Sequence, residues 1–242
     1  MLSIIGIGLN DAQDITLKGL ELVKHADFVY LENYTSTLQC PLEDLEKLYG
    51  KKIILAERAF VEDGSVIIDQ ATEGNVALLV IGDVFSATTH MSLYMEAKAN
   101  DIEVRVVHNA SVLTAISITG LQLYKLGKTT SISWHDSDAP MNVIKDNAKL
   151  HTLCLLDLAP KEDKFMESAE ALDRLMKKGF DGETKVVVCA QLGSEAPTII
   201  YQKAKDVQPL GKFPQCVVIP GELHFMEEDA LDLYKPLNNS SA

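Results

Sequence analysis

The stretch Val76-Ala-Leu-Leu-Val-Ile-Gly-Asp-Val-Phe-Ser-Ala-Thr-Thr-His90 decides the fold class. Its opening apolar run is typical of an interior strand of a parallel sheet, which is buried on both faces. Gly82 and Asp83 end the run, and a helix-like segment follows from Met91. Ligands of open α/β sheets bind at the loops after such strands, so Asp83 is a candidate small-molecule contact. A glycine turn with hydroxyls that cap the helix accounts for the same residues, and both interpretations remain open here.

Strand-like and helix-like segments alternate over the first half of the chain. Strands are expected at residues 2–8, 27–32, 52–56, 76–81 and 103–107. Helices are expected at residues 15–24, 41–48, 66–72 and 91–98. Asp14 is placed to cap the first of these helices. The alternation predicts a parallel, right-handed α/β sheet.

A second unit is expected from Ser111 onward, which gives two α/β domains at residues 1–110 and 111–242. Its strand candidates are residues 130–134, 151–156, 185–190, 198–201 and 216–219. Short or turn-rich links join the last three, which favours antiparallel pairing and a mixed sheet. A polar helix is expected over residues 162–178, ending at Gly179. We expect the tail, residues 238–242, to be disordered.

The composition is that of an ordinary globular protein, with 242 residues, 47% hydrophobic and 24% charged. The net charge of −13 argues against direct nucleic-acid binding, which needs lysines and arginines. No apolar run approaches the ~20 residues of a membrane span, and the N-terminus lacks the features of a signal peptide. We therefore expect a cytoplasmic protein that does not contact membranes. The four cysteines and six histidines show no metal-ligand spacing, so no metal site is expected.

The glycines of Gly6-Ile-Gly8 match only part of a dinucleotide fingerprint. The position three beyond Gly8 is Asp11, so a Rossmann NAD site is poorly supported. Three predicted strands nevertheless end at the same edge of the sheet, near Gly8, Glu32 and Asp83. Because parallel strands end at one edge of a sheet, we expect these loops to converge there on a ligand.

Motifs in order along the chain resemble the diphthine synthases, S-adenosylmethionine-dependent methyltransferases of the tetrapyrrole-methylase-like class. The opening Gly6-Ile-Gly-Leu-Asn-Asp-Ala-Gln-Asp14 and the segment Tyr30-Leu-Glu-Asn-Tyr-Thr-Ser36 carry the resemblance in the first half. Gly82-Asp83 with Ala87-Thr-Thr-His90, and His108-Asn-Ala-Ser111, continue it. Further matches lie at residues 119–124, 151–153, 156–157 and 219–224. The resemblance therefore covers nearly the whole chain.

The resemblance implies a fold and a function. It implies two α/β domains with the ligand cleft between them, and a homodimer. It implies methylation of the modified histidine, the diphthine intermediate, of translation elongation factor 2 in diphthamide biosynthesis. The cofactor would be S-adenosyl-L-methionine, with S-adenosyl-L-homocysteine as the product. Carried over by motif, the cofactor contacts are Leu9, Asp83, Ser86, Ser111, Val112, Leu156, Tyr201 and His224.

The chain departs from this resemblance at four positions. Val84 stands where the family usually has proline, Ser86 and Ser117 where small apolar residues are common, and Tyr201 where a small residue is usual. The changes add volume or a hydroxyl near the expected cofactor. They leave open a non-catalytic homologue with an altered cofactor pocket. A tetrapyrrole or corrin methylase of the same superclass is a further alternative.

The sequence does not single out a catalytic base. The acceptor nitrogen must lose a proton before each methyl transfer, and solvent or a nearby side chain can take it. The candidates are Glu32, Tyr34, His90 and Glu222. Glu32 and Tyr34 would also favour the quaternary ammonium that repeated methylation produces. Because positioning in the bound complex can supply much of the rate, a dedicated catalytic residue is not required.

Overall fold

The computed structural model describes residues 1–236, so the tail at residues 238–242 lies outside the described residues. The chain forms two compact units, Met1–Val112 and Leu113–Ala242. Each unit is an α/β structure with its own five-stranded sheet. Among the described residues, no helix has the length and apolarity needed to cross a membrane.

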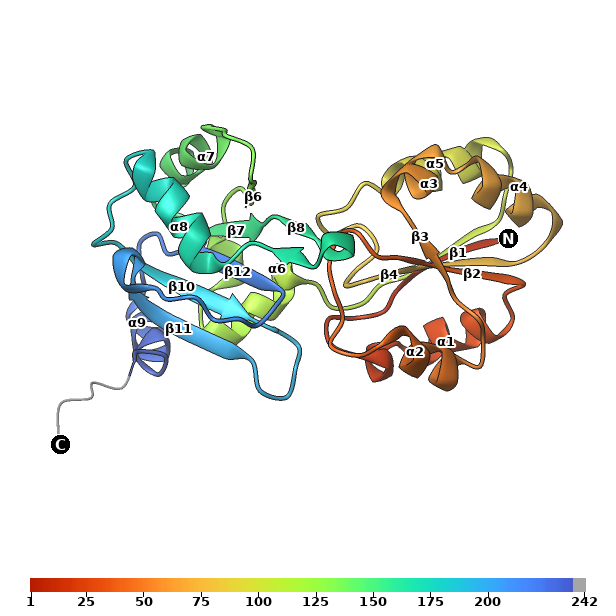
Figure 1. Ribbon diagram of the computed structural model, residues 1–242, viewed down its shortest axis with the longest axis horizontal. Helices are drawn as coiled ribbons and strands as arrows, with labels where there is room; N and C mark the ends of the chain where they lie inside the picture. The colour runs from red at the N-terminus through yellow and green to blue at the C-terminus, as the bar shows by residue number, and fades with distance from the viewer. Residues whose placement is uncertain (237–242) are drawn as a thin grey trace. The chain divides into compact units, whose positions relative to one another are not determined.

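The first unit is built on a wholly parallel sheet with strand order β3-β2-β4-β1-β5 (Figure 1). The strands are β1 (Leu2–Gly6), β2 (Phe28–Glu32), β3 (Ile54–Ala56), β4 (Val76–Val80) and β5 (Val104–Val107). The central strand β4 pairs with β2 and β1, and every one of its residues is buried. The predicted parallel sheet is thus confirmed, with slightly shorter strands.

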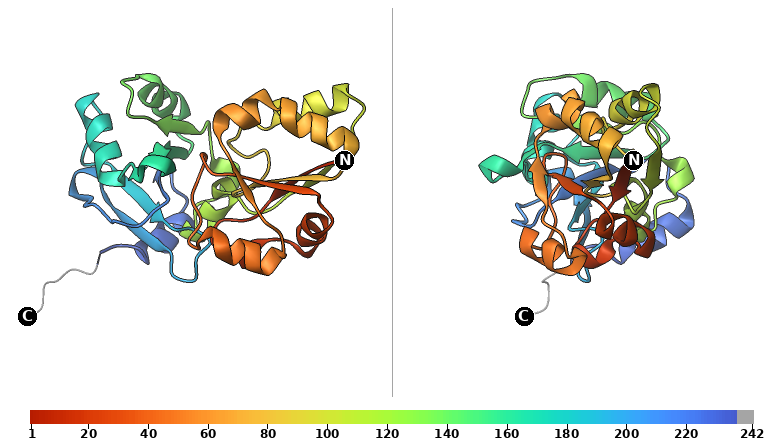
Figure 2. Two further views of the ribbon diagram at one scale, coloured as in Figure 1. Left: turned by 45° about the vertical axis from the view of Figure 1, so that its right-hand side comes forward. Right: turned by 90° about the vertical axis from the view of Figure 1, so that its right-hand side faces the viewer.

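Helices cover both faces of this sheet, as Figures 1 and 2 show. One face carries α1 (Leu17–Lys24) and α2 (Leu42–Tyr49). The other carries α3 (Arg58–Asp63), which the sequence did not predict, with α4 (Ser65–Glu73) and α5 (Met91–Ala99). Alternate residues of β4 enter the two cores, so the strand needs its continuous apolar sequence.

The predicted cap of the first helix is wrong. The hydroxyl of Thr16 accepts from the backbone N–H of Gly19 at 3.0 Å, and α1 begins one residue later. Asp14 instead lies in the short 3-10 helix η1 (Ala12–Asp14). Its Oδ2 accepts from the backbone N–H groups of Leu9 and Asn10 at 3.0 and 2.7 Å. A carboxylate at this position could accept from the first backbone N–H groups of α1 or from those of the loop after β1. The fold places Asp14 against the loop after β1.

Strands β1 and β4 are neighbours, but their outgoing connections run to opposite faces of the sheet. The loop after β1 leads to α1, and the loop after β4 leads to α5. Mutual backbone hydrogen bonds of 3.3 and 2.7 Å join Gly8 and Gly82 where the loops begin to separate. Such a reversal of strand order creates a crevice at the carboxyl edge, the usual ligand position in this architecture.

The second unit contains a mixed sheet, as predicted, with strand order β11-β10-β12-β7-β6. The strands are β6 (Thr130–Ile132), β7 (Thr152–Leu156), β10 (Lys185–Ala190), β11 (Thr198–Lys203) and β12 (Gln215–Ile219). The predicted antiparallel pairing of β10 with β11 and β12 is confirmed, and only β6 and β7 run parallel. Helices α7 (Ala139–Asn147) and α8 (Ser168–Lys177) cover one face, and α9 (Phe225–Asp232) lies on the other (Figure 1).

The helix predicted over residues 162–178 is shorter than expected. Residues Pro160–Glu162 form a 3-10 turn, and β9 (Lys164–Phe165) pairs with β8 (Leu158–Ala159), so α8 begins only at Ser168. Met166 is 1% exposed and enters the core, while Glu167 accepts from two backbone N–H groups of a distant loop. These tertiary contacts outweigh the modest helical preference of the segment.

Candidate functional site

Asp83 organises the loops at the carboxyl edge of the parallel sheet. Its Oδ1 accepts from the backbone N–H of Phe85 at 3.2 Å and from the hydroxyl of Ser86 at 3.0 Å. Its Oδ2 accepts from Nδ1 of His108 at 2.8 Å and from the backbone N–H of Asn109 at 3.1 Å. Burial raises the pKa of the carboxyl, but these hydrogen bonds outweigh it and hold the pKa below its ordinary value. Asp83 is therefore ionised, and its hydrogen bonds join the loop after β4 to the loop after β5.

Gly82 lies where the loops after β1, β4 and β5 approach one another. Its φ of +87° is readily adopted only by glycine, and a Cβ there would lie 3.7 Å from both Ala110 O and Leu9 Cδ2. Ser111, which is buried, and Val112 continue directly from Ala110. Backbone groups and the apolar side chain of Leu9 thus meet around Gly82, and two serines lie on the same loops. This combination suits S-adenosyl-L-methionine, which has an amino-acid end and an apolar, ring-bearing end.

The structure brings together five of the eight predicted cofactor contacts in the first unit: Leu9, Asp83, Ser86, Ser111 and Val112. The hydroxyl of Ser86, one of the departures from the family pattern, is used within the protein as a donor to Asp83. Val84, another departure, is fully buried in the core, and its carbonyl accepts from the hydroxyl of Thr88 at 2.9 Å. The loop is therefore ordered without a proline at position 84.

Glu32 ends β2 beside this cluster, and it is 0% exposed. Its Oε1 accepts from the hydroxyl of Thr35 at 2.5 Å and from the backbone N–H of Ile81 at 3.3 Å. Its Oε2 has no hydrogen-bond partner among residues 1–236. Burial raises the pKa of this carboxyl above its ordinary value, although the hydrogen bonds oppose the change. A buried acceptor without a partner is costly and suits a site that meets a donor from outside.

Tyr34 and His90 form a hydrogen-bonded pair near Glu32. The Tyr34 hydroxyl lies 3.3 Å from Nε2 of His90, and Nδ1 of His90 lies 3.3 Å from the carbonyl of Val84. Because only Nδ1 faces a carbonyl, Nδ1–H donates and Nε2 accepts from the tyrosine. Burial lowers the pKa of His90, which is 1% exposed, and raises that of Tyr34. A neutral imidazole and a protonated phenol are consistent with both shifts.

Arg58 lies over the ring of Tyr34. Its guanidinium carbon lies 5.0 Å from the centroid of the Tyr34 ring, within the range of a cation–π contact. The aromatic face of Tyr34 can thus hold a cation in the folded protein. Sequence reasoning missed Arg58, because nothing local connects it to a tyrosine far along the chain. His108 was missed as well, although it opens a family-like motif that carried the signal.

The remaining cofactor candidates lie in the second unit, on different faces of its sheet. Leu156 packs into the core beneath α7 and α8. Tyr201 is in register with Val187, Val218 and Leu153, whose side chains point to the opposite face. The two side chains do not line a common surface, so one ligand would meet at least one of them through backbone atoms.

Tyr201, whose size was a departure from the family, is a packed residue. It is 8% exposed, and Nζ of Lys185 lies 5.4 Å from its ring centroid. Its backbone N–H donates to the carbonyl of Tyr234 at 2.9 Å. Ser117, the fourth departure, lies in the 3-10 helix η2 (Ile116–Thr119), where its carbonyl accepts from Gly120. Both residues thus have structural partners within their own unit.

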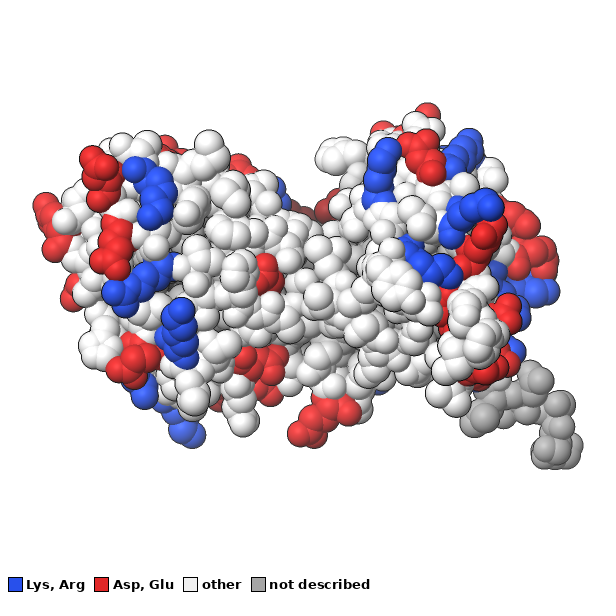
Figure 3. Space-filling model, turned by 180° about the vertical axis from the view of Figure 1, so that it is seen from behind, with Lys and Arg blue, Asp and Glu red and all other residues white. Residues whose placement is uncertain are grey.

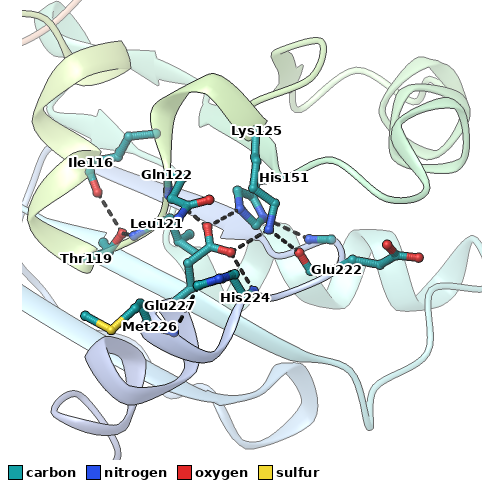
Figure 4. A network of polar contacts seen from close by, with 11 residues as sticks. Ile116, Thr119, Leu121, Gln122, Lys125, His151, Glu222, His224, Met226 and Glu227 are labelled. Carbon is teal, nitrogen blue, oxygen red and sulfur yellow. Dashed lines mark hydrogen bonds and ion pairs between the residues drawn. The ribbon is translucent and has the colours of Figure 1, made fainter.

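His224 is the N-cap residue of α9, and Glu222 lies two residues before it. The imidazole of His224 accepts from the backbone N–H of Met226, and Glu227 completes a capping box. The Glu222 side chain is 68% exposed and pairs with Lys149 at 3.0 Å. Figure 4 shows the Glu222 carboxylate pointing away from the polar network around Glu227. Glu32, Tyr34 and His90 gather in one cluster of the first unit, and Glu222 is a surface ion pair of the second.

The surface charge is mixed. On the face drawn in Figure 3, acidic and basic side chains are interspersed, and no continuous basic area is present on that face. Among the described residues, no group of three or more His, Cys, Asp or Glu side chains is placed to hold a metal ion.

Comparison with known proteins defines the class. Residues 1–208 match the family model of Tetrapyrrole (Corrin/Porphyrin) Methylases, so the chain belongs to this family. The chain is 44% identical to the diphthine synthase of Methanocaldococcus jannaschii, over 96% of this chain and 97% of that protein. It is 43% identical to an Arabidopsis thaliana protein named "Probable diphthine methyl ester synthase", over 97% and 98% of the two chains.

A solved structure agrees with these relatives. A crystal structure of diphthine synthase superposes with a TM-score of 0.91 at 36% identity, covering 97% of this chain and 96% of that one. Within the methylases, the chain therefore belongs to the diphthine synthases. It is an S-adenosyl-L-methionine-dependent methyltransferase of diphthamide biosynthesis.

Proposed function

We propose that this enzyme methylates the modified histidine, the diphthine intermediate, of translation elongation factor 2. The observation that carries the proposal is the buried carboxylate of Glu32, which has an unpartnered Oε2 at the carboxyl edge of the parallel sheet. The acceptor in this pathway is an amino nitrogen, which offers N–H donors and a positive charge before transfer. A buried oxygen that lacks a donor fits such a group.

The cofactor site is proposed at the ends of β1, β4 and β5. Leu9, Ser86, Ser111 and Val112 would contact the cofactor around Gly82, with Asp83 holding their loops in place. Leu156, Tyr201 and His224 of the second unit are proposed as further contacts. When bound, the cofactor supplies an electrophilic methyl group on a sulfonium. Contacts with the residues around Gly82 would align that group with the acceptor.

Glu32 is the proposed proton acceptor. The pKa of Glu32 is raised toward neutral pH, and a general base is most effective when its pKa lies near the working pH. Arrival of an ammonium group would favour the ionised carboxylate, and transfer of one proton to Oε2 would leave the amine free to attack. Tyr34, with its hydroxyl directed to His90 and one ring face covered by Arg58, would present its other ring face to the cation that accumulates with each methyl group.

We also propose the protein partner, the cellular location and the oligomeric state of the enzyme. The protein substrate is elongation factor 2, reached in the cytoplasm, and the enzyme acts as a homodimer. The net charge of −13 supports a protein partner in preference to nucleic acid, because binding of a phosphate backbone depends on cationic side chains.

Two measurements test the proposal. The first is the thermal unfolding midpoint with and without S-adenosyl-L-homocysteine, with NAD as the control ligand. At ~100 times its dissociation constant, the ligand stabilises by about 2.7 kcal/mol. For a chain of this size, the midpoint should rise by roughly 5–10 °C. An unchanged midpoint at millimolar ligand would favour the non-catalytic alternative.

The second measurement is transfer of labelled methyl groups to elongation factor 2 that carries the unmethylated intermediate. We expect label in the protein, and none when the target histidine is unmodified. A corrin substrate serves as the competing acceptor. Label in the corrin and none in elongation factor 2 would contradict the proposed substrate.

A further inference from the structure

Glu227 lies at the centre of a buried polar network in the second unit (Figure 4). Its side chain is 0% exposed. Oε1 accepts from the backbone N–H of Gln122 at 2.9 Å and from Nε2 of His151 at 2.8 Å. Oε2 accepts from Nζ of Lys125 at 2.5 Å and from the backbone N–H of His224 at 2.8 Å. One carboxylate thus joins three segments that are far apart in sequence.

His151 carries the connection onward. It is 0% exposed, and its Nε2 faces the Glu227 carboxylate, so this nitrogen bears the proton. Its Nδ1 accepts from the backbone N–H of Gly221 at 3.0 Å. The imidazole is therefore held in one tautomer, between an anion on one side and a backbone donor on the other.

The turn between β12 and α9 is confined from several sides. A Cβ on Gly221 would lie 2.3 Å from the carbonyl oxygen of Lys149. Nζ of Lys125 contacts both Glu227 Oε2 and the carbonyl of Glu222. Residues 221–224 are thus fixed by backbone packing, by the lysine and by the His151–Glu227 pair, before any ligand binds.

We propose that Glu227 is a positioning residue, which sets the His224 turn for cofactor binding by joining it to Gln122, Lys125 and His151. The inference rests on the proposed function, because His224 is a proposed cofactor contact. The chemistry of the site requires a carboxylate at this position. Four donors surround Glu227, and a carboxylate only accepts, whereas the amide of glutamine would place a donor against a donor.

The ionised form of Glu227 persists over the whole working range of pH. Burial raises the pKa of this carboxyl, but hydrogen bonds from Lys125, Gln122, His224 and His151 outweigh it and lower the pKa to about 2. The network is therefore a fixed support and does not titrate near neutrality through this residue.

The test compares Glu227→Gln with Gln215→Ala. Gln215 is a buried residue at the other end of β12, and it also makes four hydrogen bonds, to Glu167, Ser168 and Lys212. Both variants should lower the unfolding midpoint of the free enzyme. Only Glu227→Gln should raise the calorimetric dissociation constant for S-adenosyl-L-homocysteine, by about tenfold, and the KM for S-adenosyl-L-methionine in parallel. The value of kcat should change by less than about threefold.

Hydrogen exchange gives a readout that does not depend on ligand. The amide of Gly221 should exchange faster in Glu227→Gln than in Gln215→Ala. If Glu227→Gln does not fold, Lys125→Gln takes its place, because Lys125 is partly exposed; we expect a rise of about threefold in the dissociation constant.

Equal ligand affinity in Glu227→Gln and Gln215→Ala would overturn the inference and leave Glu227 with a purely structural role. Failure of the unmodified enzyme to bind S-adenosyl-L-homocysteine would instead overturn the proposed function, and this inference with it. If the unmodified enzyme binds S-adenosyl-L-homocysteine and neither variant loses affinity, the inference about Glu227 fails while the proposed function stands.

Discussion

Nδ1 of His108 lies 2.8 Å from Oδ2 of Asp83, which ties the loop after β5 to the loop after β4. The two residues are 25 positions apart in sequence. The contact brings the segment that contains Ser111 and Val112 next to Gly82, so the proposed cofactor site depends on a side chain that is itself fully occupied by protein donors.

Asp83→Asn is expected to weaken cofactor binding without contact to the cofactor. The amide replaces one accepting oxygen with a donor, which faces another donor from Ser86, Phe85, His108 or Asn109. Loss of a satisfied buried carboxylate should lower the free energy of unfolding by about 1–3 kcal/mol. We expect the dissociation constant for S-adenosyl-L-homocysteine to rise by about tenfold in calorimetry.

Ser86→Ala is the matched control for Asp83→Asn. It removes one donor to the carboxylate and leaves the bonds from His108 and Asn109 in place. Its effect on the dissociation constant should therefore be smaller. An equal effect of the two variants would show that the contact proposed for Ser86, and not the position of the loops held by Asp83, accounts for the loss.

Glu32→Gln is expected to stabilise the fold and reduce activity. A carboxyl whose pKa is raised on folding contributes stability that is present below its ordinary pKa of 4.5 and is lost as pH rises through the folded value. Replacing it should therefore raise the free energy of unfolding at pH 8, by about 1–2 kcal/mol, with little change at pH 4. Urea unfolding at both pH values measures the difference.

Methyl transfer by Glu32→Gln should fall by about 100-fold in kcat, the range for loss of a general base. Binding of S-adenosyl-L-homocysteine should be unchanged, because Glu32 is proposed to meet the acceptor. Activity close to that of the unmodified enzyme would assign the proton to solvent and refute the role of Glu32.

His90 is expected to make stability depend on pH below neutrality. A histidine with a lowered folded pKa contributes stability above its ordinary pKa of 6.5, and this is lost as pH falls toward the folded value. His90→Asn should remove that dependence, up to about 1.4 kcal/mol per pH unit below pH 6.5. The free energy of unfolding of both proteins between pH 5 and 8 measures it.

Tyr34→Phe serves as the control for His90. It removes the hydroxyl that donates to Nε2 and leaves the buried imidazole in place. The decline of stability below pH 6.5 should persist in this variant. Parallel curves for His90→Asn and the unmodified protein would place the source of the decline in another histidine.

Gly6→Ala and Gly82→Ala are expected to act in different ways. A Cβ on Gly6 would lie 2.6 Å from the carbonyl oxygen of Gly82, so the neighbouring backbone must move, at a cost of about 2–3 kcal/mol. A Cβ on Gly82 meets only ordinary contacts, and its cost of about 1–2 kcal/mol comes from the positive φ. Thermal unfolding should show the larger loss for Gly6→Ala.

Ligand affinity distinguishes the same two glycines in the opposite order. The methyl group of Gly82→Ala would lie between Leu9 and Ala110, at the proposed cofactor site, so the dissociation constant for S-adenosyl-L-homocysteine should rise further than in Gly6→Ala. Unchanged affinity in Gly82→Ala would move the proposed cofactor site away from this edge.

Local patterns predicted the helices and strands correctly where interactions between residues close in sequence decide the structure. The apolar run of β4 located the central strand, and turn residues located the strand ends that carry Glu32 and Asp83. The same reasoning failed at Asp14 and at residues 162–167. The Asp14 carboxylate accepts from the backbone N–H groups of Leu9 and Asn10 and so does not cap the helix. Met166 is buried in the core, and this burial stabilises the segment more than helix formation would.

The sequence by itself determined the two α/β units, the parallel and mixed sheets, and the family, because periodicity and motifs depend on residues close together in the chain. Only the tertiary structure decided which partners the polar residues have. His108 reaches Asp83, Arg58 covers Tyr34, and Glu227 gathers donors more than 100 residues away, from Gln122 and Lys125. Such contacts are set by strand order and loop closure, and the spacing of residues along the chain does not encode them locally.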